Sequence, residues 1–119
     1  MRKLKMKKGG KPVRNKGRRG QRAAQKLLQS YGYHTHELNS GTKTGDLIAT
    51  VDKYSTGKEV NYLVEVKNTK SLDIPAFLKQ ARDQAKVKKM KWMLMCKIDG
   101  GFGWLVFFEG DNEAEIWYE

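Results

Sequence analysis

VNYLVEVK, residues 60–67, is the stretch from which the rest of the fold is inferred. Every second residue from Val60 to Val66 is apolar or aromatic, whereas Glu65 and Lys67 fall on the opposite face, because side chains alternate along a β-strand. Charged groups are rarely found in a core. The pattern therefore predicts a strand with one face in the core and a charged pair on the other.

The preceding apolar stretch, DLIATV at residues 46–51, is expected to pair with this strand as a hairpin. Either of two tight turns within residues 55–57 leaves Asp46 on the face that carries Glu65 and Lys67. In the first register Asp46 lies opposite Glu65; in the second it lies opposite Lys67, with Glu65 diagonal. The other face is almost wholly apolar and is the predicted core face: Leu47, Ala49, Val51, Val60, Tyr62, Val64 and Val66.

The shared face of Asp46 and Glu65 suggests a metal site, because opposed side chains lie about 4.5–5.5 Å apart at Cβ and two carboxylates that close repel each other without a cation. Mg²⁺ prefers oxygen ligands, and the backbone carbonyl of Val66 offers a third. Such an ion polarises a phosphate and acidifies a bound water. Lys67 would orient that water or neutralise developing charge. The alternative is a solvated Glu65–Lys67 ion pair that contributes little stability.

The charge of the chain points to an anionic partner. The 119 residues, enough for one domain, contain 24 Lys and Arg against 13 Asp and Glu, a formal net charge of +11. The first 20 residues contain ten of the basic residues and no acidic one, whereas five acidic residues lie in the last eleven. Nucleic acid is the commonest partner of so basic a domain.

Several classes of protein are excluded. No apolar run approaches the roughly 20 residues that cross a bilayer, so no membrane association is expected, and the basic N-terminus is not followed by the apolar stretch of a signal peptide. The single cysteine, Cys96, excludes an intramolecular disulfide and a cysteine-cluster zinc site. These features favour a cytoplasmic protein.

The order of expected elements is α-β-β-β-α-β-β, a mixed central sheet flanked by helices. Residues 1–17 are expected to form a flexible basic arm and residues 18–119 the folded domain. The expected elements are a helix from Arg18 to near Gly32, strands at 33–38, 46–51 and 60–67, a helix capped by Asp73 and ending near Lys89, strands at 92–98 and 104–108, and a short edge strand at 115–118.

Two further features leave alternatives open. The strand at 104–108 is apolar on both faces, so one face needs a cover from a helix or from another subunit. If a subunit provides it, the interface is the late aromatic segment, Phe102 to Phe108 with Trp117 and Tyr118, and Trp104 or Phe108 faces outward. The lysines at positions 86, 88, 89 and 91 either favour a helix end through the macrodipole or contact phosphate.

The hairpin and its surroundings resemble the PD-(D/E)xK nuclease superfamily, and more closely the archaeal-type Holliday junction resolvases, which also occur in phages. The resemblance covers roughly residues 16–108. It rests on Lys16-Gly17…Arg22, Tyr31-Gly32-Tyr33, Asn39-Ser40-Gly41, Gly45-Asp46-Leu47-Ile48-Ala49, Val64-Glu65-Val66-Lys67-Asn68-Thr69-Lys70 and the aromatic strand Gly103–Phe108.

The resemblance implies a restriction-endonuclease-like fold and a homodimer that resolves four-way DNA junctions by paired nicks. It implies that Asp46 and Glu65 bind Mg²⁺, with Mn²⁺ as a substitute, that Lys67 assists catalysis and that Ser40 lies in a mobile loop near the scissile phosphate. Two positions depart from the family. Gly45 replaces the usual proline, and Gln21 stands where relatives have a glutamate ligand, so it offers only a neutral oxygen.

Basic residues around these motifs are the expected DNA contacts: Arg14, Lys16, Arg18, Arg19, Arg22, Lys43 and Lys70. Two other functions fit the same residues. One is a nuclease of this fold that acts as a monomer on other DNA structures. The other is a nucleic-acid-binding protein without enzymatic activity.

Overall fold

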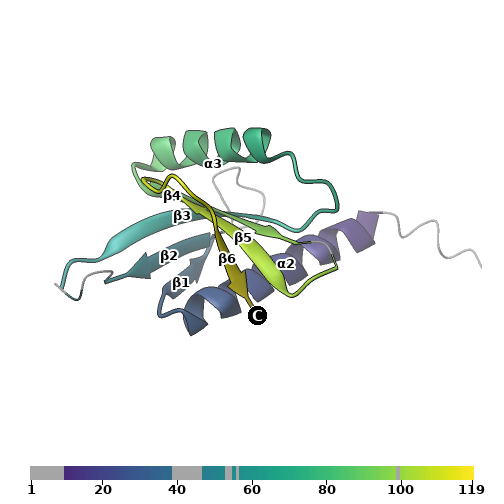
Figure 1. Ribbon diagram of the computed structural model, residues 1–119, viewed down its shortest axis with the longest axis horizontal. Coiled ribbons are helices and arrows are strands. Elements are labelled where there is room, and N and C mark those ends of the chain that lie inside the picture. Colours follow the sequence, from purple (N-terminus) through teal and green to yellow (C-terminus); the bar gives the residue numbers. More distant parts are fainter. Residues whose placement is uncertain (1–9, 39–46, 53–54, 56, 99) are drawn as a thin grey trace, which may run out of the picture.

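The chain forms a six-stranded sheet with one helix on each face in a computed structural model that describes residues 10–38, 47–52, 55, 57–98 and 100–119 (Figure 1). Its helices are α2 (Gly10–Ser30) and α3 (Ile74–Lys88). Its strands are β1 (His34–Glu37), β2 (Leu47–Val51), β3 (Val60–Lys67), β4 (Lys91–Lys97), β5 (Gly103–Phe108) and β6 (Glu115–Tyr118). Over the described residues, neither helix combines the length and apolarity needed to cross a membrane.

The strands lie in the sheet in their chain order, from β1 to β6. The pairing is antiparallel except between β3 and β4, which are parallel because α3 carries the chain from one to the other. This arrangement confirms the expected mixed sheet flanked by helices. It also confirms the short strand at 115–118, which forms one edge of the sheet as β6.

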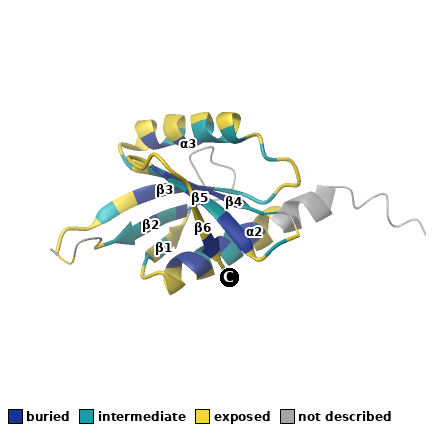
Figure 2. Ribbon diagram, in the orientation of Figure 1, coloured by how far each residue is buried: buried dark blue, intermediate teal, exposed yellow. Residues whose placement is uncertain are grey.

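The hairpin of β2 and β3 adopts the first of the two predicted registers, with Leu47 paired to Val64. The predicted core face is confirmed. Leu47, Ala49, Tyr62 and Val64 are buried, and the remaining members of that face are partly buried against the same core. This core lies between the sheet and α2, and Figure 2 shows buried segments in dark blue on both.

The helix α2 begins at Gly10, eight residues before its expected start at Arg18. The expected start of this helix was therefore wrong, whereas the division into a basic arm and a folded domain stays a prediction; residues 1–9 lie outside the described part of the chain. Pro12 is compatible with this start because the first four backbone N–H groups of a helix have no intrahelical acceptor. A missing N–H in that turn costs no hydrogen bond.

Gly32 ends α2, as its position in the sequence predicted. Its φ of +92° is one that residues with a Cβ rarely adopt. The N–H of Gly32 donates to Gln29 and that of Tyr33 donates to Leu28, both at 3.0 Å, which satisfies two carbonyls of the last turn. Tyr31 then stacks on Trp117 of β6 with ring centroids 4.1 Å apart, so the end of α2 is joined to the edge of the sheet.

Both faces of β5 are covered within the chain. Trp104, Val106 and Phe108 are buried in the core beneath α2, and Leu105 and Phe107 pack in the smaller core beneath α3. The cover is therefore a helix on each side, and Trp104 and Phe108 do not face a neighbouring subunit. Because side chains alternate along a strand, Trp104 and Phe108 share one face of β5, and that face would be exposed only without α2.

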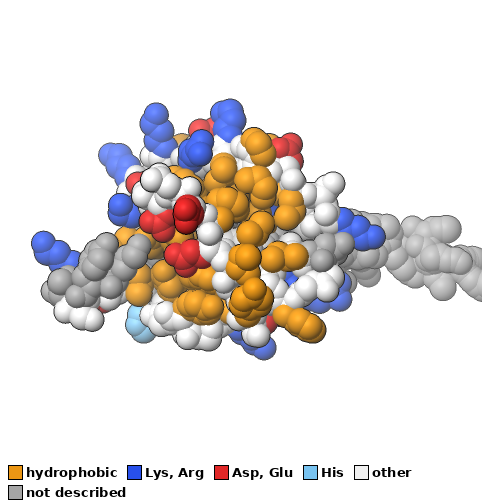
Figure 3. All heavy atoms as spheres, in the orientation of Figure 1, with side chains coloured by type: hydrophobic (Ala, Val, Ile, Leu, Met, Phe, Trp, Pro, Cys, Tyr) orange, Lys and Arg blue, Asp and Glu red, His pale blue; other side chains and the backbone are white. Residues whose placement is uncertain are grey.

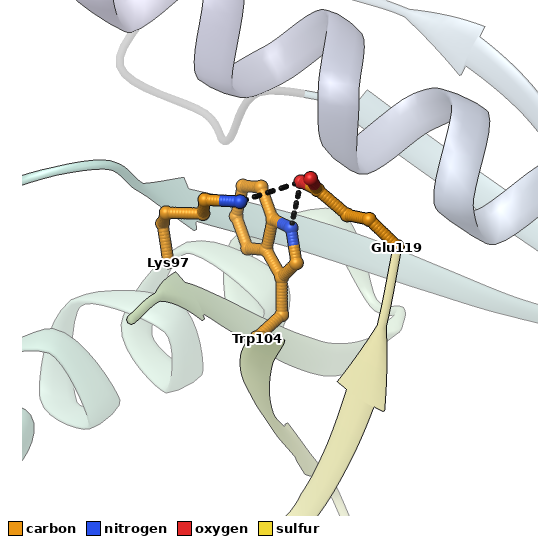
Figure 4. Close-up of polar contacts among 3 residues, drawn as sticks. All are labelled: Lys97, Trp104 and Glu119. Atoms are coloured by element: carbon orange, nitrogen blue, oxygen red, sulfur yellow. Dashed lines mark hydrogen bonds and ion pairs between the residues drawn. The ribbon is translucent and has the colours of Figure 1, made fainter. Parts of the chain in front are cut away.

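Glu119 anchors the segment that follows β6, a contact that the sequence did not reveal. Its backbone N–H donates to Phe102, and its carboxylate accepts hydrogen bonds from Lys97 Nζ at 2.6 Å and Trp104 Nε1 at 2.8 Å (Figure 4). These two hydrogen bonds, that of Lys97 first, hold the pKa of the Glu119 carboxyl below its ordinary value. The indole N–H of a buried tryptophan is thereby satisfied.

Gly20 allows α2 to lie directly against the end of β3. A Cβ at this position would lie 2.7 Å from Cβ of Asn68, the residue that follows β3, whereas a Cβ at Gly17 would meet no atom within 4 Å. We expect Gly20→Ala to lower the free energy of unfolding by about 1–3 kcal/mol through overpacking. Gly17→Ala should raise it by up to about 1 kcal/mol through helix propensity.

Urea unfolding of the two variants tests this packing, with Gly17→Ala as the matched control. Equal stabilisation by both substitutions would mean that α2 does not approach Asn68.

Candidate active site

Glu65 and Lys67 lie near the end of β3 on the face that α3 covers. Glu65 Oε2 is 3.2 Å from Lys67 Nζ, and the two side chains are 8% and 20% exposed. Among the described residues, Glu65 is the one polar or charged residue that is buried. The Lys67 ammonium also lies 5.0 Å from the centre of the Phe77 ring of α3.

This burial distinguishes the pair from an ordinary surface ion pair. The pair formed by Lys79 and Asp83 on α3 is 2.8 Å long, but its side chains are 77% and 64% exposed, and solvent screening leaves such pairs little effect on stability. Removing a carboxylate from water costs several kcal/mol unless a partner compensates it. The alternative of a solvated Glu65–Lys67 pair is therefore wrong.

The helix α3 provides the cover for this pair. Asp73 caps it, as predicted, by accepting a hydrogen bond from the backbone N–H of Ala76, and Pro75 lies in its first turn. Its apolar side then packs on β4 and β5, and Phe77 from that side reaches Lys67. The sequence predicted this helix, but not the strand residues that it covers.

The structure describes only some of the other predicted metal ligands. Asp46, like Ser40, lies outside the described residues, so its placement stays a prediction. The side chain of Val66 packs against the core beneath α2, and the ligand role of its carbonyl also stays a prediction. Gln21 is half-buried on α2, next to the glycine that contacts Asn68. No three His, Cys, Asp or Glu residues gather into a metal site within the described segments.

Several predicted DNA contacts lie at the same end of the sheet. The close packing of Gly20 on Asn68 brings the first half of α2 beside the end of β3 (Figure 1). Arg18, Arg19 and Arg22 are exposed on that half of the helix, and Lys70 is exposed between β3 and α3. Of the rest, Arg14 and Lys16 belong to α2 but their side chains are not described, and Lys43 lies outside the described residues.

What this end of the molecule can do chemically follows from its charges. A buried carboxylate next to an ammonium group supplies oxygen ligands for a hard divalent cation together with a proton donor or a fixed positive charge. The exposed arginines nearby suit a polyanion, because a guanidinium donates to phosphate oxygens in a fixed, bidentate geometry.

Comparison with known proteins identifies the fold. No family model and no curated protein matches the sequence. Among solved structures, the chain is similar to that of Hjc, a Holliday junction resolvase from the hyperthermophilic archaeon Archaeoglobus fulgidus. The TM-score is 0.52 at 18% sequence identity, over 85% of this chain and 87% of that one. The predicted restriction-endonuclease-like α/β fold is thereby confirmed, and the chain has the fold of a Holliday junction resolvase.

Proposed function

We propose that this protein is a metal-dependent endonuclease that cuts branched DNA and resolves four-way junctions by paired nicks. The observation that carries the proposal is the buried Glu65 carboxylate beside Lys67 at the end of β3. The pair occurs in a fold that is shared with a Holliday junction resolvase. A purely structural charge pair gains little from such burial, because an apolar pair of similar volume is often at least as stable.

Asp46 is the proposed second carboxylate. Leu47 and Val64 are paired, and Asp46 precedes Leu47 in the sequence as Glu65 follows Val64. This supports a shared site in which the two carboxylates hold Mg²⁺ or Mn²⁺. Val66 would add its carbonyl oxygen, and Gln21 would add a neutral oxygen in place of a third carboxylate. The bound ion would supply charge stabilisation at the scissile phosphate and a water of lowered pKa.

Lys67 is proposed to assist catalysis, and the basic residues are proposed to bind the DNA backbone. The ammonium group of Lys67, which lies 3.2 Å from Glu65, would orient the attacking water and offset charge that develops on the phosphate. Ser40 is proposed to lie near that phosphate. Arginines on α2 would fix the backbone of the substrate, together with the lysines at 16, 43 and 70.

Activity is tested with Asp46→Asn and Glu65→Gln on a synthetic four-way junction with Mg²⁺. Asp83→Asn, which removes an exposed carboxylate outside the motif, is the control. Each ligand variant should cut at least about a hundredfold more slowly, because a metal contributes several kcal/mol to the transition state. Both should still bind the junction, since a negative charge near phosphate is lost.

Near wild-type cutting by either ligand variant would show that the site is misplaced. Junction binding by a wild-type protein that never cuts in Mg²⁺ or Mn²⁺ would favour the non-enzymatic alternative.

We further propose that the working unit is a homodimer, because paired nicks need two equivalent sites and this chain has one. Exposed apolar side chains gather beside the edge strand β6, where Figure 3 shows a band of hydrophobic atoms over the front of the sheet. Ile116 and Tyr118 are 51% and 68% exposed, and Phe102 precedes the neighbouring strand β5. A second copy that covers this band would also protect the open edge.

Sedimentation velocity at micromolar concentration tests the dimer. The double variant Ile116→Glu/Tyr118→Glu should be a folded monomer that nicks junctions singly, because both side chains are exposed. Val87→Glu, at an apolar position on α3 that is 77% exposed, should remain dimeric. If the wild-type protein is monomeric both free and on a junction, the monomeric nuclease is the better account.

A further inference from the structure

A cluster of exposed lysines lies at the opposite end of the sheet from Glu65 and Lys67. We call it the α3–β4 lysine cluster; its members are Lys86, Lys88, Lys89 and Lys91. Lys88, Lys89 and Lys91 line one hollow of about 370 Å³, together with Met90 and with Glu59, Val60 and Asn61 from the start of β3. Figure 3 shows basic side chains in blue along the α3 side of the molecule.

The cluster retains a positive charge. In the part of the chain that the structure describes, the nearest approach of an acid is that of Glu109, whose Oε2 is 3.9 Å from Lys91 Nζ. Asp83 is engaged by Lys79 at 2.8 Å, and Glu59 is the one acid that lines the hollow. The four lysines face Glu59 and Glu109, and Asp83, which also interacts with Lys86, is already paired with Lys79; the net positive charge that remains attracts anions.

Lys89 is held in a backbone conformation that does not suit lysine. It forms the C-cap of α3 with φ 58° and ψ 42°, the left-handed region, and its N–H bonds to the carbonyls of Ala85 and Lys86. Helices usually place glycine or asparagine at such a position, because a Cβ is strained there. The chain therefore keeps a lysine side chain at a position where glycine would make the fold more stable, which indicates a role for that side chain.

The helix macrodipole explains only half of the cluster. Cations in the last turn stabilise a helix, which accounts for Lys86 and Lys88. Lys91 belongs to β4, and Lys89 could be replaced by glycine without loss of the cap. The charge of these two residues needs another explanation.

The cluster is well separated from the candidate active site. Lys91 pairs with Tyr62 at one end of the parallel β3–β4 ladder, and Lys67 pairs with Cys96 at the other. The five residue-to-residue steps between these two pairs span about 16 Å at roughly 3.3 Å per step. Phosphates of one DNA strand follow each other at about 3.4 Å along the helix axis, so this separation corresponds to about five nucleotides.

We propose that the α3–β4 lysine cluster is a second nucleic-acid contact, which binds the phosphate backbone of duplex DNA away from the scissile position. This inference rests on the proposed action on DNA. A second contact fixes the direction of the duplex relative to the cutting site, because one contact alone leaves the duplex free to pivot. It recognises phosphates and not bases, so its contribution is independent of sequence.

Binding of a linear 20-base-pair duplex and of a four-way junction, without divalent cations and between 50 and 200 mM salt, tests the proposal by fluorescence anisotropy. Each lost phosphate contact makes the slope of log affinity against log salt less negative by about 0.9. Lys89→Gly should show this change, whereas Lys26→Gln, which removes one exposed lysine from α2, should not. The triple variant Lys86→Gln/Lys88→Gln/Lys89→Gly should lose three contacts. Between 50 and 200 mM salt, the affinity of the wild-type protein should then fall by a factor about 40 times larger than that of the triple variant.

The melting temperature of Lys89→Gly provides a second test of the proposal. Lys89→Gly should raise the melting temperature by a few degrees while it weakens DNA binding, because the strain is relieved and the charge is lost. A binding loss caused by misfolding would instead accompany a lower melting temperature.

Failure of this proposal can be told apart from failure of the nuclease proposal. If the triple variant binds both DNAs with the wild-type slope, the cluster does not contact DNA, and an acidic protein partner becomes the better account of it; junction cutting by the wild-type protein would be unaffected by that result. If the wild-type protein binds neither DNA, both proposals are wrong.

Discussion

Burial of the Glu65 carboxylate beneath α3 is the constraint on which the functional end of this molecule depends. The charge is tolerated because Lys67 lies 3.2 Å away on the same strand face and because the ammonium group rests above the Phe77 ring. These contacts require α3 to begin close to the end of β3. They also require β3 to keep its register with β2 and β4, since a shift of one residue would move both charges to the core beneath α2.

The hairpin that carries this pair was largely predictable from sequence, because its period-two pattern allows only one face to be apolar. The ends of β3 and the capping of α3 by Asp73 were predicted, and the register was narrowed to two choices. The burial of Glu65 was not predictable, because it depends on which strand residues α3 covers. Short sequence patterns do not determine which strand residues a helix covers.

Three other features were not predicted correctly, each for its own physical reason. Trp104 and Phe108 looked equally suited to a core or to an interface until α2 and α3 were seen to cover opposite faces of β5. The start of α2 was placed too late because a basic stretch with a proline and glycines resembles a flexible arm, although the first turn of a helix accepts a proline. The anchoring of Glu119 by Lys97 and Trp104 joins residues far apart in the sequence and left no local signal.

The central claim is that Glu65, with Asp46, binds a divalent metal at the end of β3. Paramagnetic broadening of backbone amide signals by substoichiometric Mn²⁺ tests it directly, without reference to cleavage. We expect the amides of Leu47 and of residues 64–67 to broaden first, with the effect lost in Glu65→Gln. Broadening centred on the acidic segment 109–115, or unchanged in Glu65→Gln, would contradict the account.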